Sequence, residues 1–280
     1  MRAHPVSSRC GQGGDTPGKM DAFPLTRLLM NHAPSLVIQD HIATLTLQRP
    51  AAANKITPDD LVSLRRHVDT VNQTEEVLLL VLRSTGKHFC AGYDITQVSG
   101  SQTEGQGFGD MVDAIEQCRA VTLAVVQGGV YGGATDMVLA CDFRMGSSAV
   151  EMFMPAARLG LHYYLSGMER YVSRLGVDMA KRLFLTAEKL DAQAMRDCGF
   201  LTHLVPADEL EARSNALCEQ LASMAPLALL GMKHHLNRIA RGTVDPQAVR
   251  AAVLQTLASE DLKEGGLAWK EKRQPRFSGR

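Results

Sequence analysis

Two glycine-containing turns hold the residues best suited to chemistry. The first, HFCAGYDI, spans residues 88–95, and the second, GGVYGGATDMVLACDF, spans 128–143 and carries the carboxylate of Asp136. Each turn follows an apolar segment, at 77–84 and 121–128, that we predict to be a strand buried on both faces. Ligands of open α/β sheets bind at the carboxyl ends of the strands, which is where both turns would lie.

Bare glycine turns leave backbone N–H groups unpaired and approachable. The helix that we predict to begin at Gly133 adds the positive end of its dipole. Two such amides, converging from separate turns, would form an oxyanion hole for a carbonyl oxygen that gains negative charge. The alternative is that the glycines only permit tight packing of strands against helices. The spacing alone leaves both interpretations open.

The composition limits the classes of partner. The 280 residues contain 30 Lys plus Arg and 30 Asp plus Glu, so there is no electrostatic reason to expect nucleic acid or an anionic membrane. No apolar run reaches the ~20 residues of a membrane span. The six cysteines form no C-x-x-C pair and no zinc-like spacing with histidine. We therefore expect free thiols, no metal site and a reducing, cytoplasmic location.

The chain divides into three parts. Residues 1–30 are predicted to be a disordered tail, because the first 19 are polar, rich in Gly, Ser and Pro, and lack the apolar core of a signal peptide. Strands and helices then alternate over 31–205, which is typical of an α/β core. That core should open with a hairpin around residues 39–41, followed by a helix from Pro58. The region 206–280 is predicted to be helical, with helices at 206–223, 225–240 and 245–260 and a terminal stretch.

Several common catalytic motifs are missing. The segment GQGGDTPG has Thr16 where a dinucleotide-binding loop needs a third glycine, and no strand precedes it. STGKHF lacks the earlier glycine of a P-loop, and neither G-x-S-x-G nor H-E-x-x-H occurs. Nucleotide hydrolases, α/β-hydrolases and zinc peptidases thus lose their usual sequence support.

Several blocks, in order, resemble the crotonase superfamily, the enoyl-CoA hydratase/isomerase proteins. They include IATLTLQRPAAANKIT, VLLLVLRSTGKHFCAGYDI, AVVQGGVYGGATDMVLACDFRM and SEDLKEGGLAWKEKRQPRFSGR, and the likeness covers about 36–280. The resemblance implies a crotonase-like spiral of β-β-α units, with the helices of 206–280 packing into a homotrimer or a dimer of trimers. It also implies an acyl-CoA thioester ligand, in which coenzyme A is part of the substrate and no further cofactor is needed.

The resemblance further implies that two backbone amides hold an enolate of the thioester. Carried onto this sequence, these donors are Ala91 and Gly133. Lys272 and Phe277 are expected to reach a phosphate or the adenine of coenzyme A, from the same or a neighbouring subunit. The other substrate-binding positions implied are Ala51, Ala53, Lys55, Lys87, Cys90, Gly92, Tyr93, Asp94, Ile95, Tyr131, Gly132 and Ala156.

The sequence departs from the family at the acid–base residues. Family hydratases carry two glutamates, and the matching positions here are Asp136, one methylene shorter, and Ala156, which follows Pro155. A methyl group cannot move a proton or position a water molecule, so two-carboxylate hydration is not expected. Asp136 would act as a single base if apolar neighbours such as Met137 and Met154 raised its pKa. The alternative is a first-turn acid that only favours the helix dipole.

The segment GLHYYLSGMERY supplies His162, Tyr163 and Tyr164, which either replace the missing acid or narrow the pocket. Our hypothesis is an acyl-CoA enzyme of hydratase/isomerase type. In it Asp136 moves a proton, with His162 or Tyr163 as helper. The alternatives are a decarboxylase or C–C lyase acting on an acyl-CoA, and a catalytically silent acyl-CoA-binding protein.

Overall fold

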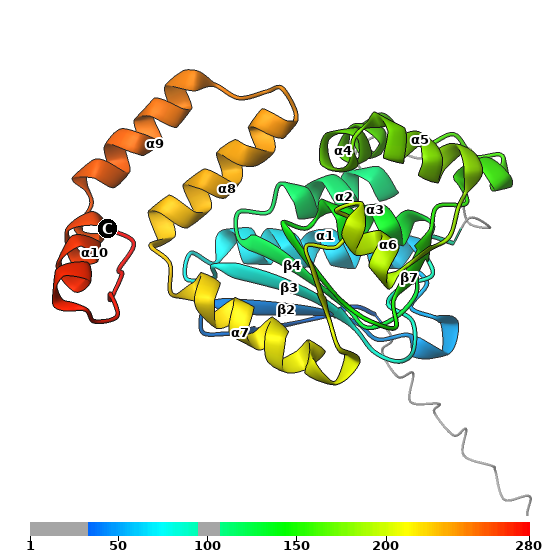
Figure 1. Cartoon of the computed structure of the whole chain (residues 1–280), viewed down its shortest axis with the longest axis horizontal. Coiled ribbons are helices and arrows are strands. Elements are labelled where there is room, and N and C mark those ends of the chain that lie inside the picture. The colour runs from blue at the N-terminus through cyan, green and yellow to red at the C-terminus, as the bar shows by residue number, and fades with distance from the viewer. Residues whose placement is uncertain (1–32, 95–106) are drawn as a thin grey trace, which may run out of the picture. The chain divides into compact units, whose positions relative to one another are not determined.

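The computed structural model describes residues 33–94 and 107–280. The predicted tail at 1–30 and the predicted site residue Ile95 lie outside these ranges. The main sheet has the order β1-β2-β3-β4-β6-β9, with β1 antiparallel to β2 and the other pairs parallel (Figure 1). Its strands are β1 (Ser35–Gln39), β2 (Ile42–Leu47), β3 (Leu79–Ser84), β4 (Val121–Val126), β6 (Phe143–Ser147) and β9 (His203–Val205). A smaller sheet joins β5 (Val130–Tyr131), β7 (Glu151–Phe153) and β8 (Leu190–Asp191).

Helices cover both faces of the main sheet, which explains why its central strands are apolar throughout (Figure 1). Leu80 and Leu82 of β3 pack in one core with α1 (Pro58–Gln73), α2 (Phe108–Glu116) and α3 (Gly133–Ala140). Leu79 and Val81 alternate to the other face and pack in a second core with α7 (Leu210–Ala222). The remaining helices are α4 (Leu165–Leu175), α5 (Val177–Thr186), α6 (Ala192–Asp197), α8 (Pro226–Ala240), α9 (Pro246–Ala258) and α10 (Glu260–Glu271).

Most predicted elements are confirmed. β1 and β2 form the expected hairpin, with Gln39 paired to Ile42, and α1 begins at Pro58 behind a Thr57 cap. The helical C-terminal region is present as α7 to α10. The strand predicted for 77–84 begins only at Leu79, because the Val77 N–H closes a turn on the Thr74 carbonyl at 3.1 Å. Within the described ranges, the helices are too short or too polar to cross a membrane.

Candidate active site

The two glycine turns lie side by side at the carboxyl ends of β3 and β4. The Tyr131 N–H donates to the Cys90 carbonyl at 3.0 Å, and the Phe89 N–H donates to the Gly129 carbonyl at 3.0 Å. Because β3 and β4 are parallel neighbours, the turns that follow them start at the same edge of the sheet. The structure thus confirms that the turns converge.

Close approach of the turns requires glycine at position 92. Gly92 has a φ of +90°, which disfavours any residue with a Cβ. A Cβ there would lie 2.6 Å from the Tyr131 carbonyl oxygen and 3.2 Å from the Gly133 nitrogen. Tight packing is therefore one role of this glycine, and that packing sets residues 92 and 93 against the start of α3.

Ala91 is not available as an oxyanion donor, contrary to the prediction, because its N–H donates to the Ala53 carbonyl at 2.9 Å. The Gly92 carbonyl accepts from the Ile56 N–H at 2.9 Å. In a trans peptide the carbonyl and the following N–H point in opposite directions, so the Tyr93 N–H points away from Ile56. It has no acceptor among the described residues. Tyr93 therefore replaces Ala91 as the candidate donor in this turn.

Gly133 supplies the second amide as the first residue of α3. The Gly132 carbonyl accepts from the Thr135 N–H at 3.0 Å and from the Thr135 hydroxyl at 2.6 Å, both within the first helical turn. By the same peptide geometry, the Gly133 N–H points out of the helix N-terminus. No acceptor for it occurs in the part of the chain that the structure describes. Two unpaired amides from distant turns thus meet at this edge.

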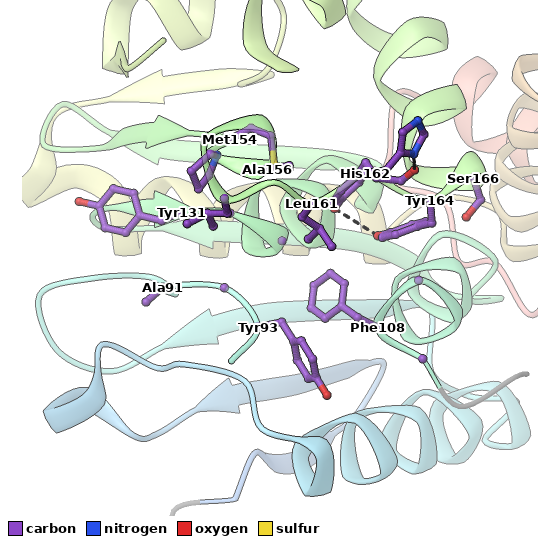
Figure 2. Close-up of a pocket in the computed structure, with 18 of the residues that line it drawn as sticks. Ala91, Tyr93, Phe108, Tyr131, Met154, Ala156, Leu161, His162, Tyr164 and Ser166 are labelled. Carbon is purple, nitrogen blue, oxygen red and sulfur yellow. Dashed lines mark hydrogen bonds between the residues drawn. The ribbon is translucent and has the colours of Figure 1, made fainter. Parts of the chain in front are cut away.

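Both candidate donor residues border a cavity of about 650 Å³ (Figure 2). Four of the five tyrosines of the chain line it. An apolar cavity with a few placed polar groups is typical of a small-molecule site. The large side chains in its wall are Tyr93, Phe108, Tyr131, Phe153, Met154, Leu159, Leu161, Tyr163 and Tyr164.

Asp136 does not lie in the wall of this cavity, contrary to its predicted role as a base that faces the substrate. It is fully buried, and its Oδ2 accepts from Arg170 Nη1 at 2.7 Å and from the Tyr164 hydroxyl. The surroundings of Asp136 are not only the apolar neighbours that the sequence suggested, since its ion-pair partner Arg170 is also fully buried. Asp136 Oδ1 has no hydrogen-bond partner among the described residues.

Arg170 is the centre of a buried charge cluster that fixes Asp136. Its Nη2 lies 2.5 Å from Asp113 Oδ1, and its Nε lies 3.1 Å from Glu116 Oε1, both on α2. Arg241, just after α8, also pairs with Glu116, at 2.5 Å. Burial alone would raise the pKa of Glu116, but the neighbouring arginines outweigh it and the pKa is lowered. The cluster thus connects α3, which carries Asp136, to α2, to α4 and to the end of α8.

The three polar residues before α4, His162, Tyr163 and Tyr164, differ in their contacts with Asp136. Only the Tyr164 hydroxyl reaches Asp136. The Tyr163 ring stacks on Tyr164 with centroids 4.4 Å apart, and the two hydroxyls are 3.3 Å apart. His162 is exposed, and its Nδ1 lies 2.8 Å from the Tyr163 carbonyl oxygen. Ala156 lies in the cavity wall, where its methyl group brings no proton donor.

The substrate-binding residues implied by the resemblance divide into two groups. Besides Ala156, those in the cavity wall are Gly92, Tyr93, Tyr131 and Gly132. Those outside it are Ala51, Ala53, Lys55, Lys87, Cys90, Asp94, Lys272 and Phe277.

Several residues of the second group have other contacts. Lys55 pairs with Asp94 at 2.6 Å, and Cys90 is fully buried, which raises the pKa of its thiol to about 12. Phe277 approaches Gly265 of α10, not the cavity of its own chain. Because a coenzyme A moiety would extend well beyond the cavity, these positions stay predictions. In 33–94 and 107–280, no three His, Cys, Asp or Glu side chains are grouped so that they could hold a metal ion.

Comparison with known proteins identifies the family of the chain. Residues 37–280 match the sequence model of the enoyl-CoA hydratase/isomerase family. The chain is 26% identical over 279 residues to peroxisomal Delta(3,5)-Delta(2,4)-dienoyl-CoA isomerase of Arabidopsis thaliana, covering 92% of this chain and 99% of the relative. It is 29% identical over 241 residues to methylmalonyl-CoA decarboxylase of Escherichia coli K12, covering 81% and 90%.

The fold agrees as well. The crystal structure of enoyl-CoA hydratase from Bacillus anthracis matches with a TM-score of 0.81 and 26% identity, over 88% of this chain and 99% of that chain. The predicted crotonase-like fold is thereby confirmed. Since the family match covers nearly the whole described chain, the protein belongs to the enoyl-CoA hydratase/isomerase family and is an enzyme of that type.

Proposed function

We propose that the protein binds an acyl-CoA thioester and stabilises its enolate between the amides of Tyr93 and Gly133. The observation that carries the proposal is that two turns, 40 residues apart, bring to one apolar cavity two amides that have no acceptor in 33–94 and 107–280. Donors already aimed at a developing oxyanion contribute about 2.7–4 kcal/mol each. The acyl chain would then occupy the aromatic part of the cavity, beside Phe108.

The reaction that this site favours is proton transfer along the acyl chain, as in an isomerisation. Hydration by two carboxylates needs one to position water and one to deliver a proton. Ala156 offers no such group, and Asp136 is paired with Arg170 outside the cavity wall. An isomerisation needs only an enolate and one group that removes a proton from one carbon and returns it to another.

Decarboxylation of a carboxylated acyl-CoA is the second candidate. Loss of CO₂ forms the enolate without a base, so it tolerates a cavity with no free carboxylate. Of the described carboxylates in the wall, Asp110 caps the Gly107 N–H at 2.8 Å and Asp113 pairs with Arg170. This arrangement fits a decarboxylase as well as an isomerase.

Two experiments test the proposal. A panel of acyl-CoA thioesters, enoyl, saturated and carboxylated, is incubated with the enzyme and analysed by mass spectrometry. Isomerised or decarboxylated products distinguish the two candidates, and binding without any turnover would favour a silent acyl-CoA-binding protein. In D₂O, enolate formation should also exchange the α-protons of butyryl-CoA.

The second experiment compares Gly133→Pro with Gly133→Ala. Proline is tolerated at the first position of a helix but has no N–H, whereas alanine adds the same Cβ and keeps the N–H. In both variants the new Cβ would lie 2.8 Å from the Phe108 ring, so both have the same steric clash with that ring. We expect exchange by Gly133→Pro to be about 100- to 1000-fold slower than by Gly133→Ala. Equal rates in folded variants would reject the oxyanion role of Gly133.

We also propose that residues 206–280 pack in a trimer or a dimer of trimers. Large apolar side chains are exposed on three C-terminal helices, with Leu236 at 63%, Leu257 at 61% and Trp269 at 88%. Exposed apolar surface of this kind marks interaction sites. Sedimentation velocity should show a trimer or hexamer, and a stable monomer would contradict the assembly.

A further inference from the structure

Asp136 is held outside the wall of the cavity. Its side chain is fully buried, and Oδ2 is shared by Arg170 and the Tyr164 hydroxyl. Arg170 is held in turn by Asp113 and Glu116, so the carboxylate cannot swing toward the cavity without breaking a buried ion pair. One hydrogen-bond partner of Asp136 does line the cavity and can connect it to a ligand.

Tyr164 is that partner. It is the residue just before α4 and lines the cavity. Figure 2 shows its ring reaching in from the start of α4, with the hydroxyl end on the side of Leu161 and Phe108. Asp136 is three residues after Gly133 on α3, so a hydroxyl that binds Asp136 lies within one helical turn of the proposed oxyanion donor.

Packing fixes the orientation of this hydroxyl. Tyr163 stacks on the Tyr164 ring with an interplanar angle of 27°, and the Phe108 ring meets it edge-on with centroids 6.5 Å apart. A Cβ at Gly167 would lie 2.8 Å from the Tyr164 ring and 2.9 Å from Asp136 Oδ2. The absence of a side chain at Gly167 therefore leaves space for the hydrogen bond between Tyr164 and Asp136. Burial and the charge of Asp136 raise the pKa of Tyr164, so it rests as a neutral phenol.

We propose that Tyr164 is the catalytic residue that exchanges a proton with the acyl chain, and that Asp136 and Arg170 are positioning residues that act through it. The inference rests on the proposed function. In the forward step a C–H bond of the acyl chain breaks and its electron pair forms the enolate. The proton bonds to the Tyr164 oxygen, while the former hydroxyl proton passes to Asp136 Oδ2. The reverse transfer protonates the carbon that receives the electron pair.

In this arrangement the Asp136 carboxylate is connected to the cavity through the Tyr164 hydroxyl. Tyr171 of α4 does not line the cavity, and its hydroxyl lies 2.5 Å from that of Thr135. It therefore provides a matched control: Tyr171→Phe and Tyr164→Phe each remove one phenolic hydroxyl, from α4 and from the residue just before it.

The test measures α-proton exchange of butyryl-CoA in D₂O, together with the dissociation constant of the same thioester. Tyr164→Phe should slow the maximal exchange rate by about 100-fold or more and leave binding within about threefold, as expected for a lost proton-transfer group. Tyr171→Phe should stay within about fivefold of wild type. Exchange by a folded Tyr164→Phe variant at the wild-type rate would overturn the assignment.

A double variant guards against a purely structural effect. In Tyr164→Phe/Asp136→Glu, the longer carboxylate can enter the space left by the hydroxyl, so exchange should recover at least tenfold over Tyr164→Phe. No recovery, with thioester binding intact, would overturn the relay. If wild type exchanges no thioester of the panel, the proposed function fails as well. If wild type exchanges and Tyr164→Phe matches it, only the role of Tyr164 fails.

Discussion

Substituting Gly92 by alanine should separate the two turns that form the proposed oxyanion hole. The new Cβ would sit 2.6 Å from the Tyr131 carbonyl oxygen and 3.2 Å from the Gly133 nitrogen. Both contacts are with backbone, which cannot rotate away as a side chain can. The turn that carries Gly133 must then shift by several tenths of an ångström relative to Tyr93.

Two separate losses follow. The φ of +90° at Gly92 costs an alanine about 1–3 kcal/mol of folding stability. Misplacing one oxyanion donor costs about 2.7–4 kcal/mol in the transition state, or about 100- to 1000-fold in kcat. KM should change much less, because the ground-state carbonyl uses these donors weakly.

The assay compares kcat, KM and urea denaturation for wild type, Gly92→Ala and Gly199→Ala. Gly199 has a similar φ of +80°, but a Cβ there meets nothing within 4 Å. Gly199→Ala should therefore share the stability loss and keep its kcat. The reasoning is refuted if Gly92→Ala retains kcat within about threefold, or if Gly199→Ala loses as much kcat as Gly92→Ala.

The other predictions concern the charge cluster and the thiols. Arg170→Met leaves Asp136 and Glu116 buried beside an apolar side chain, and should lower the free energy of unfolding by about 3–5 kcal/mol in urea titrations. The pKa of Glu116 is lower in the folded protein than in the unfolded chain, so the unfolded chain binds more protons at this residue as the pH falls. The ionised Glu116 therefore stabilises the fold fully above pH 4.5, and this stabilisation is lost as the pH falls through the pKa of the folded protein. The stability difference between wild type and Glu116→Gln should shrink accordingly below pH 4.5. Native alkylation at pH 8 should modify half-buried Cys198 before Cys90, whose buried thiol has a pKa of about 12.

Each of these has an outcome that contradicts it. Arg182 pairs with Glu188 at the exposed surface, so Arg182→Met is the control and should leave stability nearly unchanged. An equal loss for both arginine variants would reject the buried-cluster argument. A difference between wild type and Glu116→Gln that is constant from pH 3 to 7 would reject the linkage. Alkylation of Cys90 ahead of Cys198, seen by mass spectrometry of peptides, would show that the first turn opens.

The fold could be predicted because its local signals agree with one another. The apolar runs that became β3 and β4, the Pro58 helix start and the glycine-to-helix change at Gly133 are all short-range patterns. The C-terminal helices were also predicted from local sequence patterns. The boundary error at Val77 arose because hydrophobicity alone does not reveal a turn that the residue closes with its own backbone.

The site was only partly predictable, because its chemistry depends on contacts between distant residues. Sequence spacing placed the glycine turns together correctly but could not show that the Ala91 N–H is taken by the Ala53 carbonyl. Likewise, nothing near Asp136 in the sequence indicates that Arg170, 34 positions later, would pair with it. Tyr164 stood out only as one polar residue among three, since its partner lies on another helix.

A crystal structure with a slowly reacting acyl-CoA thioester bound would test the central claim most directly. The account predicts the thioester oxygen at about 2.7–3.1 Å from both the Tyr93 and the Gly133 nitrogen, with the acyl chain beside Phe108. A thioester oxygen beyond hydrogen-bonding distance of both nitrogens would contradict it.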